Sequence, residues 1–263
     1  DTPTSPFGGS ADYIWGPKGE NIYYVSKKLT GVEYVTSTNT DIYRYNLKSG
    51  KTTNVTKSNK GYDKYPAFSK DGKLAWLQMK TPGYEADKND IIVKMKGKDV
   101  NLTGHWDGTV NSFKWSQSGK FIYFIAPIDG TVQLFRVAVT TKSKPQVKQL
   151  TKGEWVVTAF HGFSKDGKKI FVTSTAATPT ERHLYCVKVK SGDMIKLSDV
   201  AGYHRFVPNS DCSYFIDDYS STTIPRAVRI ISADGKVVKE LKSVENPLKD
   251  YKLADLELGV MKG

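Results

Sequence analysis

A short acidic stretch at residues 79–90 carries side chains that could bind a charged ligand. It interrupts an otherwise apolar pattern and contains Tyr84, Glu85 and Asp87. A pair of carboxylates beside an aromatic ring can bind a cation or an amine, so we take these three residues as candidate substrate contacts. The structural alternative is a loop whose acids pair with nearby lysines.

A second candidate site lies at residues 179–183, directly before an apolar segment. Glu181 and Arg182 stand there side by side, and we add both to the candidate substrate contacts. The structural alternative is that Glu181 and Arg182 pair with one another at the edge of a sheet.

No stretch of the sequence has the pattern of a catalytic nucleophile. A serine hydrolase needs the sharp Gly-x-Ser-x-Gly turn to expose its hydroxyl, and residues 162–167 have one residue too many for it. A phosphate-binding loop and a dinucleotide fingerprint are both absent. We therefore expect no catalytic residue in this chain, no cofactor, and no activity of the chain alone.

Histidine and cysteine spacing argues against a metal site. The four histidines, His105, His161, His183 and His204, are at least 21 residues apart, without the close pairs of common zinc sites. Cys186 and Cys212 lie in consecutive units of the repeat described below. They could form one disulfide or remain two buried thiols, and the sequence leaves both open.

Composition indicates a folded protein without a membrane span. The 263 residues include 15 Tyr, 11 Phe and 5 Trp, too many rings for a disordered chain, and no apolar run approaches 18 residues. The formal net charge is +12, but many lysines fall in short polar turns and no five like charges are consecutive. Such lysines are typical of solvated loop tips, so we do not expect a nucleic acid partner.

An internal repeat must position the candidate residues. An aromatic-small-x-x-Gly turn ends at Gly19, Gly72, Gly119 and Gly167, with spacings of 53, 47 and 48 residues. A closing hydroxyl residue recurs every 47 or 48 residues at Thr56, Thr103, Thr151 and Ser198. A fifth, degraded unit follows around residues 208–242. Two independent markers with the same period indicate a repeat architecture.

Each unit contains short segments rich in aromatic and β-branched residues, bounded by Gly, Asp, Ser and Lys turns. Four short strands per 47 residues or so is the arithmetic of a β-propeller blade. We therefore predict an all-β propeller with five four-stranded antiparallel blades, and leave open whether they close a ring. The blades are expected at residues 11–56, 63–103, 107–151, 155–198 and 203–242, with residues 243–263 as a linker. The aromatic residues of the marker turns are expected to stack blade against blade; these are Trp15, Phe68, Trp115 and Phe163.

Several segments resemble the propeller domain of the prolyl oligopeptidase family of serine peptidases. Residues 150–157, 181–185 and 214–221 resemble the last blades of dipeptidyl peptidase IV-like enzymes. Residues 37–43 and 83–88 are closer to the dipeptidyl peptidase V and acylaminoacyl-peptidase branch. The resemblance implies a propeller that caps an α/β-hydrolase domain, toward which residues 243–263 would lead.

The resemblance implies a noncatalytic, substrate-gating role in an exopeptidase that cleaves short peptides. It also implies a periplasmic or secreted location, and it is compatible with a homodimer of the full-length enzyme. The paired glutamates that hold the substrate amine in dipeptidyl peptidase IV are not found as such, and Glu85 to Asp87 is the nearest acidic loop. One alternative is a TolB-like propeller scaffold for protein contacts. Another is a sugar-active lyase propeller, which would need a metal-binding histidine cluster.

Overall fold

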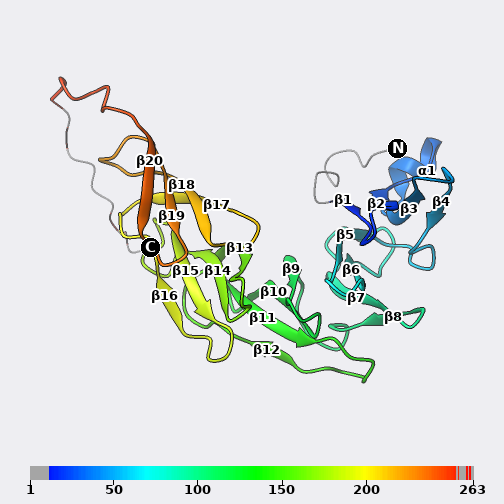
Figure 1. The fold of residues 1–263 in the computed structure, drawn as a ribbon. Coiled ribbons are helices and arrows are strands. Elements are labelled where there is room, and N and C mark those ends of the chain that lie inside the picture. Colours follow the sequence, from blue (N-terminus) through cyan, green and yellow to red (C-terminus); the bar gives the residue numbers. More distant parts are fainter. Residues whose placement is uncertain (1–11, 253, 255–258, 260, 262–263) are drawn as a thin grey trace. The chain divides into compact units, whose positions relative to one another are not determined.

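The computed structural model describes residues 12–252, 254, 259 and 261 (Figure 1). The chain divides into two compact units, Asp1–Lys152 (unit 1) and Gly153–Gly263 (unit 2). The named strands form five four-stranded antiparallel sheets, which confirms the predicted all-β fold with propeller-type blades. In every sheet the four strands follow one another in sequence order, so each blade is a simple meander.

Unit 1 contains three blades. Blade 1 consists of β1 (Tyr13–Trp15), β2 (Asn21–Ser26), β3 (Asp41–Asn46) and β4 (Thr52–Asn54), with a six-residue helix, α1 (Gly31–Thr36), between β2 and β3. Blade 2 consists of β5 (Asp63–Phe68), β6 (Leu74–Gln78), β7 (Asp90–Met95) and β8 (Lys98–Asn101). Blade 3 consists of β9 (Ser112–Trp115), β10 (Phe121–Ile128), β11 (Thr131–Ala138) and β12 (Val147–Gln149).

Unit 2 contains two blades. Blade 4 consists of β13 (Val157–Phe163), β14 (Lys169–Ser174), β15 (His183–Lys188) and β16 (Met194–Lys196). Blade 5 consists of β17 (Tyr203–Pro208), β18 (Tyr214–Ser220), β19 (Ala227–Ser232) and β20 (Val237–Ser243). The predicted linker is described only in part, since residues 253, 255–258, 260 and 262–263 lie outside the described residues.

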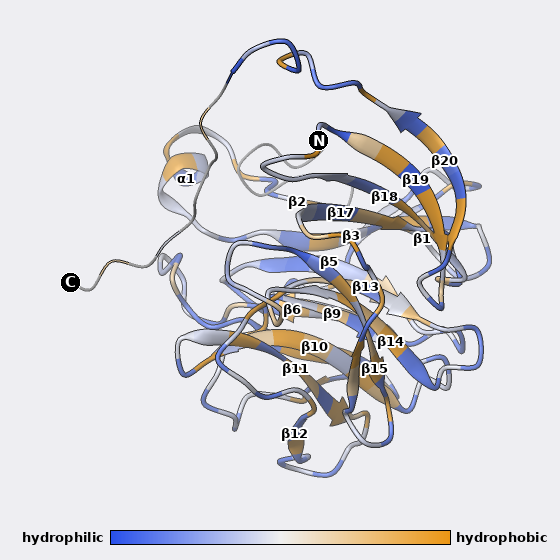
Figure 2. Cartoon of the chain, turned by 90° about the vertical axis from the view of Figure 1, so that its left-hand side faces the viewer, coloured by the Kyte–Doolittle hydropathy of each residue, from blue (hydrophilic) through white to orange (hydrophobic). Residues whose placement is uncertain are grey.

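The middle strands carry the core. In Figure 2 the hydrophobic colour is concentrated on central strands such as β10 and β14, while the turns are mostly hydrophilic. Large side chains of four blades are fully buried, among them Trp76, Phe124, Phe171 and Phe215. One apolar cluster joins blades 1 and 2, a second joins blades 2 and 3, and a third joins blades 4 and 5. Within each unit, adjacent blades therefore share a core, as expected when one blade cannot bury its own faces.

The marker turn is a hairpin turn held by its own side chains. Gly72 and Gly167 have φ angles of 84° and 69°, which a residue without a Cβ adopts without strain. The Ser69 hydroxyl donates to Asp71 over 2.6 Å and accepts the Lys73 amide over 2.8 Å. This bonding explains why the small residue and the glycine recur together.

The aromatic positions of the marker turns pack as expected at two sites in unit 1 but not at Trp15. The Phe68 ring meets Tyr23 of blade 1 edge-on at 4.9 Å, and Trp115 Nε1 donates to the Ala67 carbonyl of blade 2 over 3.1 Å. Trp15 is 64% exposed, so the stacking predicted for it is wrong. The difference arises because the described residues include no strand before β1 on which this ring could pack.

The closing hydroxyl residue fastens the third strand of its blade. In blade 2 the Thr103 hydroxyl donates to Asp90 over 2.9 Å and accepts the Ile91 amide over 3.0 Å. Blades 1, 3 and 4 repeat this arrangement through Thr56 with Asp41, Thr151 with Gln133, and Ser198 with His183. The acids Asp41 and Asp90 are therefore structural, and the repeat marker is a buried polar contact whose loss would leave an amide unpaired.

A second recurring contact joins successive blades. The residue before a third strand accepts an amide from the start of the next blade: Thr40 from Asp63 over 3.0 Å, Asn89 from Val110 over 3.1 Å, and Arg182 from His204 over 3.2 Å. The loops that precede these residues are the 27–40, 79–89 and 175–182 segments. Both candidate stretches therefore lie in the same loop of their respective blades, between the second and third strands.

Candidate functional site

The loop between β6 and β7 holds the first candidate stretch in unit 1. Tyr84 lies at its tip with 54% of its surface exposed, and Glu85 is also exposed. Two backbone hydrogen bonds shape the tip, from Tyr84 to Thr81 over 3.4 Å and from Asp87 to Tyr84 over 3.2 Å. The loop therefore presents an aromatic ring and a carboxylate to solvent.

Asp87 supports the loop from within. Its carboxylate accepts the backbone amides of Lys80, Thr81 and Lys88 over 3.0, 2.6 and 2.8 Å. Slight burial opposes ionisation, but these donors hold the pKa of Asp87 below its ordinary value. The acid bonds main-chain amides rather than the lysine ammonium groups expected in the structural alternative.

Glu85 is oriented by a buried tyrosine. The Tyr62 hydroxyl donates to Glu85 Oε1 over 3.4 Å. Burial and the neighbouring Glu85 charge raise the pKa of Tyr62 to about 12, so the hydroxyl keeps its proton at neutral pH. Asp87 is occupied by three amides, whereas Glu85 is exposed and has this one contact among the described residues, so Glu85 is the carboxylate of the loop that can accept an amine.

Glu181, the candidate carboxylate of unit 2, is held by a buried histidine. Its Oε2 lies 2.7 Å from Nε2 of the buried His183, whose Nδ1 lies 2.8 Å from the Ser198 hydroxyl. The Glu181 carboxylate only accepts, so the proton of the neutral ring sits on Nε2, and Nδ1 then accepts the Ser198 hydroxyl proton. Burial lowers the pKa of His183 although Glu181 opposes the shift, so a neutral imidazole holds the carboxylate.

Arg182 does not pair with the Glu181 carboxylate, contrary to the structural alternative. Its Nη1 donates to the carbonyls of Pro179 and Glu181, both over 2.9 Å, and the guanidinium lies 5.6 Å from the ring centre of Tyr203. The side chain is half-buried, while Tyr203 is 53% exposed. Arg182 therefore fixes the shape of the loop that carries Glu181.

A buried ionic network, which sequence reasoning missed, lies beneath this loop. His204 Nδ1 is 2.7 Å from Asp217 and Nε2 is 2.9 Å from the Val200 carbonyl. The ring is therefore held between two acceptors, one of them a buried carboxylate. Asp217 also accepts Arg229 Nε over 3.0 Å, and Arg229 Nη2 reaches Asp199 over 3.0 Å.

Aromatic contacts connect the network to the candidate site. The rings of His183 and His204 are 5.3 Å apart, and His204 stacks on Tyr219 at 4.8 Å. The two histidines are far apart in sequence but occupy the neighbouring segments joined by the contact between blades 4 and 5. The sequence held a signal for this ring contact, because each histidine stands at or next to the first residue of a strand in consecutive blades.

Unit 1 has its own buried carboxyl group at Asp63, the first residue of β5. It accepts Trp76 Nε1 over 2.7 Å, Gln78 Nε2 over 2.8 Å and Asn59 Nδ2 over 3.2 Å. Burial raises the pKa of Asp63 to about 7 even though these donors favour the ionised form. All three donors are neutral, so none of them is a counter-ion for the carboxylate. The carboxyl group therefore titrates near neutral pH.

A cavity of about 350 Å³ opens between β5 and β9, the first strands of blades 2 and 3. Tyr65 and Phe113 are among its lining residues. Tyr65 is 42% exposed, and its φ angle of 54° coincides with a break in the β5–β6 register. A non-glycine residue in this region stores strain, which often accompanies a binding surface.

The two cysteines are not joined by a disulfide. Cys186 and Cys212 are free thiols, and both are buried in the apolar cluster of blades 4 and 5. Of the two arrangements left open by the sequence, the structure has the separate thiols.

No helix in the described part of the chain has the length and apolarity needed to cross a membrane.

Comparison with known proteins gives this geometry a context. Residues 86–226 match the family described as the dipeptidyl peptidase IV (DPP IV) N-terminal region. Dipeptidyl-peptidase 5 of Porphyromonas gingivalis is 39% identical over 157 residues, which cover 59% of this chain and 22% of that protein. The chain thus aligns with less than a quarter of that curated relative.

Solved structures support the propeller fold. A puromycin-hydrolyzing peptidase from Mycobacterium tuberculosis has a TM-score of 0.63 at 18% identity, over 92% of this chain and 39% of that one. TolB from Acinetobacter baumannii has a TM-score of 0.51 at 19% identity, over 86% of this chain and 52% of that one. At these identities the likeness concerns the fold alone.

Proposed function

We propose, because the chain belongs to the family of dipeptidyl peptidase IV N-terminal regions, that its blades are the noncatalytic propeller part of a serine exopeptidase of the dipeptidyl-peptidase 5 type. The observation that carries the proposal is the 39% identity to such an enzyme over a segment folded as four-stranded blades. The hydrolase domain with the catalytic serine would lie in another part of the whole protein, which acts on short peptides. We further propose a periplasmic or secreted location and leave a homodimer of the whole enzyme as a compatible assembly.

The propeller would contribute by selecting and positioning substrate. A fixed carboxylate that holds the peptide's amino terminus would place the scissile bond at a defined distance. The gain is in orientation rather than in bond chemistry. We expect the chain alone to bind such peptides without cleaving them.

Glu181 is the residue we assign to the amino terminus. Its carboxylate is held by neutral His183 on one side and remains about one quarter exposed. Arg182 and His183 are positioning residues for it. Unit 1 has a candidate acceptor of its own in Glu85; Asp87 holds its loop, and Tyr84 exposes an aromatic ring beside it.

The alternative is a TolB-like scaffold that binds other proteins, and the likeness to TolB structures favours it at the level of fold. A scaffold would bind a folded partner through blade surfaces and would be indifferent to a free amino terminus. Dependence on that amine therefore separates the two functions.

Replacing Glu181 with glutamine should weaken binding of a short peptide with a free amino terminus by about tenfold or more, because a charge-assisted hydrogen bond is lost. Isothermal titration calorimetry on the whole chain measures the dissociation constant. An acetylated copy of the peptide should bind the wild type and the variant equally weakly.

The matched control is Glu240→Gln on β20, which removes the same charge from an exposed strand of the same unit. It should leave the dissociation constant unchanged. Equal losses in both variants would mean that overall charge, rather than the Glu181 carboxylate, governs binding.

A further inference from the structure

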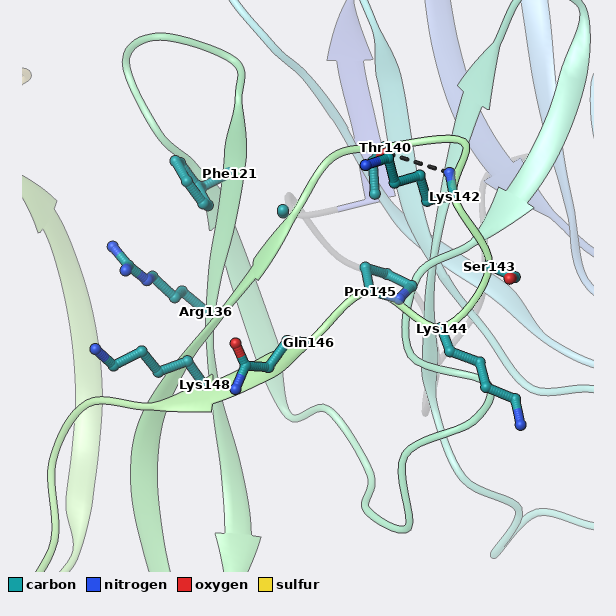
Figure 3. A pocket seen from close by; sticks show the side chains of 10 residues that line it. Phe121, Arg136, Thr140, Lys142, Ser143, Lys144, Pro145, Gln146 and Lys148 are labelled. Carbon is teal, nitrogen blue, oxygen red and sulfur yellow. Dashed lines mark hydrogen bonds between the residues drawn. The ribbon is translucent and has the colours of Figure 1, made fainter.

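Blade 3 carries a cationic pocket on its third and fourth strands that the proposed function does not use. The pocket has a volume of about 340 Å³ and is formed by β10, β11, β12 and the connection between β11 and β12 (Figure 3). Its walls combine four cationic side chains with apolar ones. They include Phe121, Arg136, Ala138, Pro145 and Lys148. Pockets of this size accommodate small organic ligands.

Two cations in this pocket stand directly opposite one another. Arg136 on β11 and Lys148 on β12 are register partners in the antiparallel pair. Figure 3 shows both side chains extending in the same direction, with their nitrogen atoms at neighbouring positions, while Lys144 points away from them. Like charges directly opposite each other on a sheet are destabilising, so this pairing has a cost in the empty protein.

The equivalent positions of other blades show that the fold does not require this pair. Counting back from the closing hydroxyl residue, the corresponding pairs are Arg44–Thr53 in blade 1, Val93–Val100 in blade 2 and Cys186–Ile195 in blade 4. None of these pairs has two cations. The arrangement in blade 3 is therefore a local feature of that blade.

No carboxylate neutralises the pair among the described residues of unit 1. Lys94 on blade 2 bonds its own register partner Asp99 over 2.6 Å, whereas neither Arg136 nor Lys148 has a salt bridge with a described residue. Arg136 is nevertheless fixed, because its guanidinium lies over the Phe121 ring at 5.0 Å. An oriented arginine beside a second cation is the geometry that recognises a doubly charged anion.

We propose that this pocket binds the phosphate group of a phosphate monoester. The guanidinium of Arg136 would donate two hydrogen bonds to the phosphate oxygens and Lys148 would supply the second positive charge. The organic part of the ligand would lie against Phe121, Ala138 and Pro145, which are apolar residues of the lining. The site is independent of peptide binding, since it uses none of the residues assigned to the substrate.

Calorimetric titration of the whole chain with phenyl phosphate tests this assignment. We expect binding at one site with a dissociation constant of about 1 mM or tighter, and about tenfold or greater weakening in Arg136→Gln and in Lys148→Gln. Inorganic phosphate should bind more weakly than phenyl phosphate, because it lacks the apolar part. Equal affinity for the two probes would overturn the monoester assignment.

The matched control is Arg44→Gln, which removes an exposed arginine from the equivalent position of blade 1. It should keep the affinity of the wild type. A loss as large as that of Arg136→Gln would attribute binding to the overall positive charge and overturn the proposal, as would the absence of binding to the wild type. Lys148 lies exposed on the outer strand, so Lys148→Gln provides the test even if Arg136→Gln folds poorly.

Discussion

Replacing Asp217 with asparagine is expected to lower the free energy of unfolding of unit 2 by about 3–5 kcal/mol. Asp217 is fully buried and is the anion between His204 and Arg229. The substitution removes the carboxylate that bonds the His204 ring and one of the two acidic partners of the buried guanidinium. An uncompensated buried charge is among the costliest defects a single substitution can introduce.

Asp218 provides the control, because it is the next residue on the same strand. It forms a two-point ion pair with Arg226 over 2.8 and 2.7 Å, but Arg226 is 70% exposed. Surface pairs contribute little, so Asp218→Asn should cost no more than about 1 kcal/mol. Urea titrations of both variants and the wild type measure the difference, and similar losses would show that the buried network does not stabilise blade 5.

The second large effect concerns Asp63 and depends on pH. Its pKa is about 7 in the folded protein and near 3.8 when unfolded. The folded state therefore binds the proton more tightly, so the contribution of Asp63 to stability is complete below about pH 4 and is lost as the pH rises through about 7. With roughly 1.4 kcal/mol for each pKa unit, the loss is at most about 4.5 kcal/mol.

Asp63→Asn removes this titration while keeping an oxygen for Trp76 and Gln78. The stability of the wild type minus that of the variant should therefore decline steadily from about pH 4 to about pH 7. Denaturant titrations at a series of pH values give this difference. Asp107→Asn, at an exposed position, should follow the wild type throughout, and a flat difference for Asp63→Asn would exclude the carboxyl as the titrating group.

The fold could be predicted from the sequence because the repeat markers act locally. Gly72 recurs because its turn needs a positive φ, and Thr103 recurs because its hydroxyl serves the third strand of its own blade. Each marker therefore leaves the same short pattern in the first four units. Trp15 was predicted wrongly because its role depends on a neighbouring blade rather than on its own turn.

The candidate site was predictable only in part. Tyr84 and Glu85 became candidates because an acidic, aromatic loop interrupts an apolar pattern, and their role in binding stays a prediction. The contact of Glu181 with His183 could have been inferred, since residues two apart on an extended chain lie on the same side. The ring contact between His183 and His204 and the strain at Tyr65 arise from contacts between strands, which sequence spacing alone does not reveal.

The most direct test of the proposed function uses the unmodified chain and one short peptide in two forms, with a free and with an acetylated amino terminus. Calorimetry should show that the free form binds about tenfold more tightly, and mass spectrometry of the recovered peptide should show it uncut. Equal affinity for the two forms would contradict amine recognition by this propeller. Release of a dipeptide would contradict its noncatalytic role.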